Sequence, residues 1–241
     1  MVNALVVGGN RGIGLGLVQE LLKDKRVEHV FATARKPSEA KELSSITDAR
    51  LTIVQMAVDD DPSIKAAVEK VSQTVGEAGL DLLINNAAVL TEVDPKKPVD
   101  RAALMYMLNT NVASPMVVTS LFYPLLKKAA GRRGHAQVAN ISSTGGSSAL
   151  CKGGFQGWHV VGYCASKAAL NRYTVYTSKY FAPDNVRVTA FCPGWVKTEM
   201  GTQAGELTVE ESVSKLAPLI LSLGPEHNGG YYNQKGEQIP W

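Results

Sequence analysis

A chain of 241 residues, 45% of them hydrophobic, is long enough to form one large α/β domain, and two small domains are the less favoured division. Its 25 basic and 22 acidic residues leave a net charge of only +3, which argues against a dedicated nucleic-acid surface. We expect no secretory signal and no membrane segment, because no apolar run approaches the ~18 residues of a span. Three cysteines without metal-binding spacing favour a reduced, cytoplasmic protein that holds no metal.

Short apolar strands alternate with helical segments along the whole chain. The expected strands cover residues 4–7, 27–34, 51–58, 80–85, 137–142, 186–192 and 231–232. The expected helices cover 15–25, 38–44, 59–75, 104–128, 163–180 and 208–223, with a break or offset near Pro115. This alternation predicts a single domain built on a doubly wound, parallel, Rossmann-like α/β sheet. The segments 143–161 and 193–207 leave the carboxyl ends of strands, where such sheets bind ligands.

A glycine-rich turn joins the first expected strand to the first helix, with the sequence Val7-Gly8-Gly9-Asn10-Arg11-Gly12-Ile13-Gly14. Glycine permits a tight turn and lets a pyrophosphate approach the backbone at the N-terminus of the helix. The turn therefore predicts a dinucleotide site, although its G-x-x-x-G-x-G spacing differs from the common G-x-G-x-x-G pattern. A plain strand-to-helix turn is the alternative.

The residue after the second strand indicates which ribose group the cofactor carries. An acidic side chain there would bind a 2′-hydroxyl, but this chain has Ala34-Arg35-Lys36. Arg35 and Arg11 together offer two cations to a 2′-phosphate. We therefore expect NADP(H) in preference to NAD(H), and the alternative is that both arginines are simply solvated.

Tyr163 and Lys167 lie four residues apart in an expected helix, so their side chains leave the same face. A cation within about 4–6 Å favours the phenolate, so Lys167 is expected to lower the pKa of Tyr163. Such a tyrosine can act as a general acid or base near neutral pH. Because this spacing also occurs by chance, the interpretation depends on the other motifs.

Three further motifs close the middle strands: Asn85-Asn86-Ala87-Ala88, Asn140-Ile141-Ser142-Ser143 and Pro193-Gly194-Trp195-Val196-Lys197-Thr198. With the glycine turn and the Tyr163/Lys167 pair, they follow the order of the short-chain dehydrogenase/reductase family, which essentially the whole chain resembles. Within that family, Asn10-Arg11-Gly12, the 193–198 motif and the final Asn228-Gly229-Gly230 and Ile239-Pro240-Trp241 resemble carbonyl reductases of the C-factor/sniffer type.

The resemblance implies a role for each matching residue. Tyr163 corresponds to the acid/base, Lys167 to the lysine that lowers its pKa and binds the nicotinamide ribose, and Ser143 to the serine that binds the substrate carbonyl. Asn111 corresponds to the helix asparagine that supports a proton-relay water. The expected cofactor-binding residues, besides Tyr163 and Lys167, are Gly8, Asn10, Arg11, Gly12, Ile13, Gly14, Arg35, Ala57, Val58, Asn86, Ala87, Pro193, Val196 and Thr198.

Three of these assignments have competitors. Ser142 competes with Ser143, because a slip of one residue on a strand reverses the side-chain face. Asn109 competes with Asn111, whose side chain has the alternative role of satisfying a buried backbone group. Thr198 is either a pyrophosphate contact or a helix N-cap.

The chain departs from the family pattern at four places. Val7 replaces a threonine, Ala88 a glycine, and Ala57 an aspartate that would bind the adenine amino group, although the nearby acidic run 59–61 offers a replacement. A lost hydrogen bond is worth roughly 0.5–1.5 kcal/mol, so these changes weaken cofactor binding only modestly. The stretch from Ser143 to Tyr163 is also longer than in many relatives.

Large apolar side chains occur in both segments beside the expected site. They are Phe155 and Trp158 before Tyr163, and Trp195 and Met200 after the sixth strand. As lining residues they would suit a hydrophobic or aromatic carbonyl substrate. The alternative is that these side chains pack within their own surface loops.

The leading hypothesis is an NADPH-dependent carbonyl reductase that passes hydride to an aldehyde, ketone or quinone while Tyr163 donates the proton. A biosynthetic ketoreductase or dehydrogenase with one dedicated substrate is an alternative of the same fold. A non-catalytic NADP(H)-binding signalling protein of C-factor type is another, although the intact set of catalytic residues argues against it. The resemblance also implies a homodimer or homotetramer, paired through helices 104–128 and 163–180, and the chain suggests no membrane or nucleic-acid partner.

Overall fold

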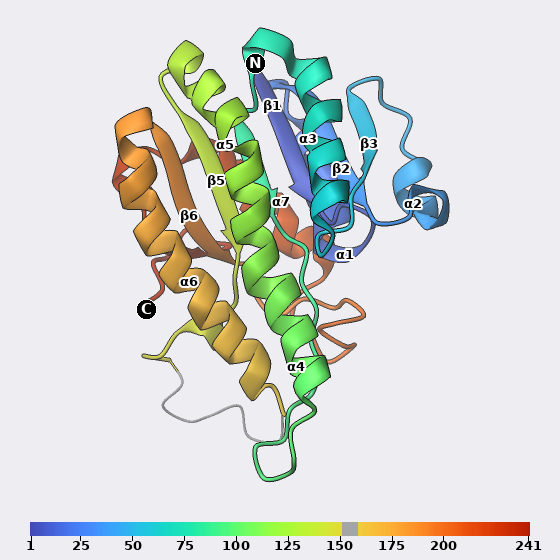
Figure 1. Cartoon of the computed structure of the whole chain (residues 1–241), viewed down its shortest axis with the longest axis vertical. Coiled ribbons are helices and arrows are strands. Elements are labelled where there is room, and N and C mark those ends of the chain that lie inside the picture. The colour runs from blue at the N-terminus through green and yellow to red at the C-terminus, as the bar shows by residue number, and fades with distance from the viewer. Residues whose placement is uncertain (151–158) are drawn as a thin grey trace.

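The computed structural model describes residues 1–150 and 159–241, which form an α/β structure around one parallel sheet (Figure 1). The strand order is β3-β2-β1-β4-β5-β6-β7. The strands are β1 (Val2–Val7), β2 (Val27–Ala34), β3 (Leu51–Gln55), β4 (Leu82–Asn85), β5 (Ala136–Ile141), β6 (Val186–Cys192) and β7 (Tyr231–Asn233). All six pairings are parallel, so the predicted fold class is confirmed.

Helices cover both faces of the sheet. In Figure 1, α3, α5 and α6 lie in front of the strands, and α1 and α7 lie behind them. The helices are α1 (Gly12–Lys23), α2 (Lys41–Ser44), α3 (Asp61–Val75), α4 (Arg101–Leu108), α5 (Ser114–Arg133), α6 (Val161–Phe181) and α7 (Val209–Ser222). Short 3-10 helices cover Pro37–Glu39, Gly76–Ala78, Thr144–Gly146, Ala182–Asp184 and Pro225–His227.

The alternation of side chains along β1 explains why the sheet is buried on both faces. Leu5 and Val7 belong to a core cluster shared with α3 and α5, and Ala4 and Val6 belong to a cluster shared with α1 and α7. All four side chains are at most 2% exposed. A strand buried in this way must be almost wholly apolar, and this accounts for the continuous runs in the sequence.

The strand order reverses between β1 and β4, which are neighbours in the sheet but far apart in the chain. In open parallel sheets the crevice outside the carboxyl ends at such a point is the place for a ligand. The glycine turn follows β1 there, and Asn86 follows β4. The topology therefore positions two of the predicted cofactor motifs side by side.

The expected helix 104–128 is longer than its prediction and has no break. α4, a π-helical turn (Asn109–Ala113) and α5 form one helical run from Arg101 to Arg133. The π turn produces the offset that was expected near Pro115, which lies in the first turn of α5. π turns inside helices are frequent at functional sites, and this one carries Asn111.

Other element boundaries differ by a few residues. α1 begins at Gly12, because the end of the glycine turn is already helical, and α6 begins at Val161, ahead of Tyr163. β3 ends at Gln55 and β4 begins at Leu82, so both are shorter than expected. Leu80, two residues before β4, donates its N–H to the carbonyl of Leu125 on α5 (3.0 Å) and so lies outside the ladder.

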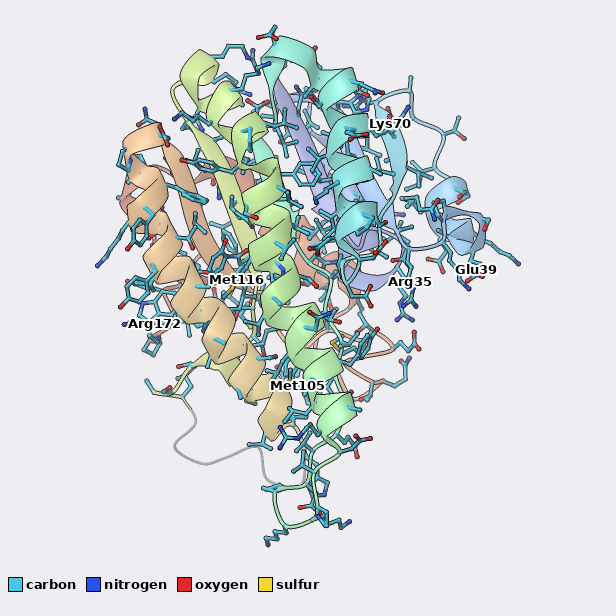
Figure 2. All side chains as sticks on the ribbon, viewed as in Figure 1. Arg35, Glu39, Lys70, Met105, Met116 and Arg172 are labelled. Atoms are coloured by element: carbon cyan, nitrogen blue, oxygen red, sulfur yellow. The ribbon has the colours of Figure 1, made fainter. Side chains whose placement is uncertain are left out.

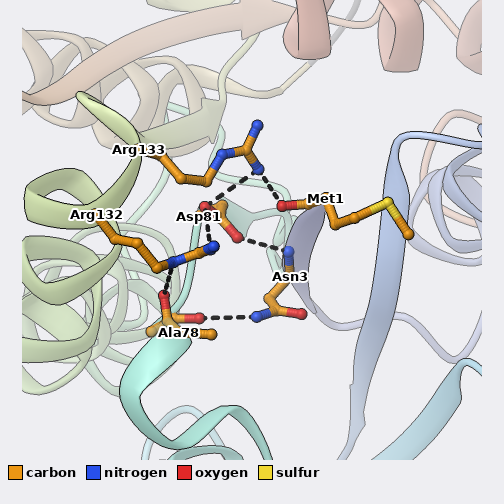
Figure 3. A network of polar contacts seen from close by, with 7 residues as sticks. Met1, Asn3, Ala78, Asp81, Arg132 and Arg133 are labelled. Atoms are coloured by element: carbon orange, nitrogen blue, oxygen red, sulfur yellow. Dashed lines mark hydrogen bonds and ion pairs between the residues drawn. The ribbon is translucent and has the colours of Figure 1, made fainter.

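A buried carboxylate ties together the end of the sheet that lies opposite the site (Figure 3). Asp81, directly before β4, accepts the N–H of Asn3 (2.8 Å) and pairs with Arg133 (3.3 Å) and Arg132 (3.6 Å). The two arginines come from the last turn of α5, which ends at Gly134 with φ +85°. This basic stretch therefore closes the fold at the amino ends of the strands.

None of the described helices combines the length and apolar character needed to cross a bilayer.

Candidate active site

The glycine turn is a tight backbone cradle between β1 and α1. A side chain at Gly14 would lie 2.0 Å from the carbonyl oxygen of Gly8, so no larger residue fits without moving the turn. Asn86 closes the cradle from β4, because its Nδ2 donates to the same oxygen (2.9 Å). Gly8 itself has φ +76°, a conformation that favours glycine. The exposed backbone at a helix N-terminus fits a pyrophosphate group.

Thr33 supplies the turn with a hydroxyl that Val7, in place of the family's threonine, lacks. Its Oγ1 accepts the N–H of Gly8 (2.9 Å), and its carbonyl accepts the N–H of Gly9 (2.9 Å). The hydroxyl comes from the neighbouring strand β2 and not from position 7, where Val7 stands. A buried threonine within the otherwise apolar stretch 30–34 was the signal available in the sequence.

The two arginines predicted for the 2′-phosphate have different surroundings. Arg35, directly after β2, is exposed and has no ion-pair partner among the described residues; Figure 2 shows its side chain extending away from the sheet. Arg11 instead forms an ion pair with Glu199 of the 193–207 loop, and both side chains are exposed. Lys36 pairs with Glu39 at 2.9 Å. Of these three basic residues, Arg35 is therefore the one whose guanidinium is not already paired with a described carboxylate.

At the predicted adenine side of the cradle, position 57 offers its backbone and no carboxylate, because it is an alanine. The N–H of Ala57 donates to Ser63 Oγ (2.9 Å). Within the acidic run 59–61, Asp60 serves as the N-cap of α3, because its carboxylate accepts the N–H of Ser63 (3.1 Å). Val58 is partly buried, as is Ala87, which packs directly against Gly8.

α6 places Tyr163 and Lys167 on one face, one turn apart. Lys167 is 2% exposed, and its Nζ donates to the carbonyl of Ile141 at the end of β5 (2.8 Å). The same nitrogen lies 5.6 Å from the centre of the Tyr163 ring. The strand end and the helix face thus bring together the two groups that the spacing predicted.

Burial dominates the electrostatics of this pair. It raises the pKa of Tyr163; the nearby Cys192 thiol adds to the rise, and a hydrogen bond with the Ser143 side chain opposes it. Burial also lowers the pKa of Lys167 to about 8, with Cys192 partly opposing. In the chain by itself the pKa of Tyr163 therefore lies above its ordinary value, and burial is the dominant cause. The lowering of this pKa by Lys167 stays a prediction.

The two adjacent serines have separate tasks. Ser142 is 2% exposed, and its hydroxyl donates to Asn171 Oδ1 (2.6 Å) inside the protein. Ser143 is the N-cap of the 3-10 helix Thr144–Gly146, and its side chain also bonds to that of Tyr163. The geometry therefore favours Ser143 as the hydroxyl next to the tyrosine.

Asn111 is buried in the π turn and joins two segments of the site. Its side-chain amide makes a pair of hydrogen bonds with the backbone of Val89 (both 2.8 Å), and its Nδ2 also donates to Ser166 Oγ (3.0 Å). Asn109, the competing residue, is exposed. The side chain of Asn111 thus satisfies a buried backbone group next to Lys167, while the water-supporting role stays a prediction.

The loop after β6 lies against the glycine turn. Thr198 contacts Gly12, and its Oγ1 accepts the N–H of Gly201 (3.0 Å) within a turn. No helix begins at Thr198, so the N-cap alternative is wrong. Pro193 accepts a hydrogen bond from Ser212 of α7 (2.6 Å), and Val196 forms a bridge with Leu207.

The predicted substrate-lining residues are only partly placed. Trp195 is 38% exposed, and its Nε1 donates to the carbonyl of Gly201 (2.7 Å). Met200 is 37% exposed on the same loop. Phe155 and Trp158 lie outside the described residues.

Comparison with known proteins identifies the chain. Residues 2–207 match the family model described as short chain dehydrogenase. The chain belongs to the short-chain dehydrogenase/reductase family. Among solved structures it is similar to the carbonyl reductase Sniffer of Drosophila melanogaster, with 32% identity, full coverage of both chains and a TM-score of 0.94. The NADPH-bound carbonyl reductase from chicken fatty liver gives 36% identity, coverage of 99% of this chain and 98% of that one, and a TM-score of 0.93.

The predicted kinship with C-factor-like proteins also has support. The C-signal protein of Myxococcus xanthus is 34% identical over 162 residues, which cover 67% of this chain and 93% of that protein. The prediction of an oxidoreductase with a short-chain dehydrogenase fold is thus confirmed.

Among residues 1–150 and 159–241 of this dehydrogenase, no three His, Cys, Asp or Glu side chains are grouped closely enough to hold a metal ion.

Sequence reasoning missed three residues of this dehydrogenase site. Cys192 is a buried thiol beside Tyr163 and Lys167, and the N–H of Thr144 donates to its sulfur (3.3 Å). Asn171 lies one turn beyond Lys167 on the same helix face, which was a signal available in the sequence. Tyr231 reaches the site from β7, and the sequence around it contains no motif that indicates a role there.

Proposed function

We propose that this short-chain dehydrogenase is an NADPH-dependent carbonyl reductase acting on an aldehyde, ketone or quinone. The observation that carries the proposal is the grouping of Ser143, Tyr163 and Lys167 at the carboxyl end of β5, beside the phosphate-sized glycine cradle. The NADPH-bound and Sniffer carbonyl reductases, which share the fold over the whole chain, support the same reaction class.

The residues present fit NADP(H). The backbone of the glycine turn, with Asn86 and Thr198 on either side, would hold the pyrophosphate, and Arg35 would hold the 2′-phosphate. Lys167 and Tyr163 would hold the nicotinamide ribose, and Val196 and Pro193 would flank the carboxamide. When bound, NADPH supplies the hydride for the carbonyl carbon.

The protein's own groups handle the charge that develops on the carbonyl oxygen. The hydroxyls of Ser143 and Tyr163 donate to that oxygen, and Tyr163 passes its proton to it. The raised pKa of Tyr163 keeps the phenol protonated, as a proton donor must be. Lys167 supplies a positive charge next to the tyrosine, and Asn111 holds the helix and the β4 loop that enclose it.

The substrate is a hydrophobic or aromatic carbonyl compound, because the exposed Trp195 and Met200 lie on the loop that borders the cradle. Turnover is tested by following NADPH absorbance with a panel of aldehydes, ketones and quinones. Broad turnover with apolar aldehydes or quinones is the expected result. Turnover of one compound alone favours a dedicated biosynthetic enzyme, and tight NADPH binding without any turnover favours a non-catalytic signalling protein.

Exchanging Arg35 for an acidic residue is expected to change the cofactor preference. Arg35→Asp removes the cation next to the 2′-phosphate and adds a repelling charge, so we expect the KM for NADPH to rise roughly 10–100-fold while NADH is used better. Steady-state kinetics with both cofactors measure the shift. Lys36→Asp, with the same charge change one residue along, is the matched control and should shift the preference far less. An unchanged preference in Arg35→Asp contradicts the assignment.

We also propose that the chain acts in the cytoplasm as a homodimer or homotetramer. Large apolar side chains are exposed on α4 and α6, where the partner helices were expected: Met105, Tyr106, Val161, Tyr176 and Tyr180. Figure 2 shows Met105 near the lower end of α4, on the side that also carries α5 and α6. Sedimentation velocity distinguishes these assemblies from a monomer, which would contradict the proposal.

A further inference from the structure

The turn that carries Ser143 is held from the far end of the chain. Tyr231, in β7, donates its hydroxyl to the carbonyl oxygen of Ser143. The tyrosine is fully buried, and its ring is stacked on that of Trp241, with centroids 5.1 Å apart and planes 21° apart. The packing of the buried ring therefore fixes the position of the Tyr231 hydroxyl.

The same turn is held at further points along its length. Asn171 accepts the hydroxyl of Ser142 (2.6 Å) and donates to the carbonyl of Gly146 (3.1 Å). The residues next to Trp241 continue this arrangement. Ser147 Oγ donates to the carbonyl of Pro240 (2.6 Å), and the N–H of Ala149 donates to the carbonyl of Trp241 (3.1 Å).

The carbonyl of Ser143 accepts two hydrogen bonds, and their origins differ. One comes from the N–H of Gly146 (2.7 Å) and is part of the local 3-10 turn. The other comes from Tyr231 and joins the Ser143 carbonyl directly to β7. Without it the turn keeps its other contacts, but the Ser143 carbonyl loses its bond to β7 and the serine can move relative to that strand. A catalytic hydroxyl must stay within about 0.5 Å of its productive position, so such a shift matters for the reaction.

We propose that Tyr231 is a positioning residue for Ser143: it fixes the serine hydroxyl against the substrate carbonyl by holding the serine's own backbone carbonyl. This role rests on the proposed reductase function. Tyr231 touches neither the substrate nor the reacting atoms. Its hydroxyl also interacts with the side chains of Asn171 and Ser142, which hold the same turn. In the proposed role its effect on the reaction passes through Ser143, and this dependence gives a measurable signature.

A double-mutant cycle that combines Tyr231→Phe with Ser143→Ala measures this dependence through kcat. Tyr231→Phe removes only the hydroxyl and keeps the ring stacked on Trp241. In the otherwise unchanged enzyme we expect kcat to fall about tenfold, with the KM for NADPH unchanged. In a Ser143→Ala background the same change should have almost no further effect on kcat, because the hydroxyl that Tyr231 positions is gone.

Tyr232→Phe is the matched control, because this residue follows on the same strand and packs against the opposite face of the sheet. It should leave kcat unchanged. Thermal unfolding shows whether Tyr231→Phe is stable enough for the kinetic assay. If it is not, Trp241→Ala is used instead, because this change loosens the packing of the Tyr231 ring and keeps the Tyr231 hydroxyl. Its smaller loss of kcat should likewise vanish in the Ser143→Ala background.

The possible failures are distinguishable. Independent losses that multiply in the double variant, or a normal kcat in Tyr231→Phe, overturn the positioning role while leaving the reductase intact. A wild-type protein without turnover on any carbonyl compound defeats the proposed function, and the positioning role falls with it. A Ser143→Ala variant with full activity also overturns the role, because there would then be no serine hydroxyl to position.

Discussion

Tyr163→Phe is expected to lower kcat for carbonyl reduction by roughly 10²–10⁴-fold, the range that general acid catalysis contributes. The change removes the proton donor and keeps the buried ring beside Lys167, so the fold and the affinity for NADPH should be largely preserved. Single-turnover kinetics, together with a fluorescence titration of NADPH, measure both quantities.

Tyr176→Phe is the matched control for that change. Tyr176 lies on the same helix but is 50% exposed, and its hydroxyl accepts a hydrogen bond from Arg172 (2.9 Å) away from the site. Its loss should leave kcat near the wild-type value. Full activity in Tyr163→Phe would show that the proton comes from another group.

Lys167→Met is expected to remove the pH dependence of stability that the buried lysine imposes. The pKa of Lys167 is about 8 in the folded chain, below its ordinary value of 10.5, because burial disfavours the ammonium. The folded state therefore releases the proton first as pH rises, and the unfolded chain binds more protons between pH 8 and 10.5. Stability rises with pH across that window, so wild type should gain roughly 3 kcal/mol relative to the variant.

Urea unfolding at a series of pH values between 7 and 11 tests this prediction. Below pH 8 the ammonium is charged in both states, so the difference between wild type and variant should be constant there. Lys179→Met removes an exposed lysine from the same helix and should follow the wild-type curve. A pH-independent difference between wild type and Lys167→Met would mean that burial does not shift this lysine. The variant should in addition lose most of its reductase activity.

Most of the architecture is readable from the sequence because local signals and topology agree. Alternating strands and helices leave few topologies, and the glycine turn, Asn86 and Arg35 must all follow strands at the same edge of the sheet. The choice between Ser142 and Ser143 is different. β5 ends at Ile141, so the period of a strand does not extend to either serine, and only the 3-10 turn after it decides which hydroxyl faces Tyr163.

The features that sequence analysis missed depend on distant partners or on backbone detail. The π turn at Asn109–Ala113 differs from an α-helix only in its hydrogen-bond ladder, and no residue type specifies it. The pKa shifts of Tyr163 and Lys167 depend on burial by the assembled fold, whereas their spacing alone pointed to an attractive pair. Tyr231 meets Ser143 across 88 positions of the chain, and periodicity says nothing about such a contact.

The contacts that Tyr231 and Trp241 make with the Ser143 turn mean that the position of Ser143 depends on a segment synthesised after it. The elements that carry the glycine cradle, β1, α1, β2 and β4, all precede Ser143 in the chain. β7 follows every other strand in the chain, and Tyr231 cannot donate to the carbonyl of Ser143 until β7 pairs with β6. Because a domain generally folds as a unit, we expect Ser143 to reach its final position only once β7 has joined the sheet.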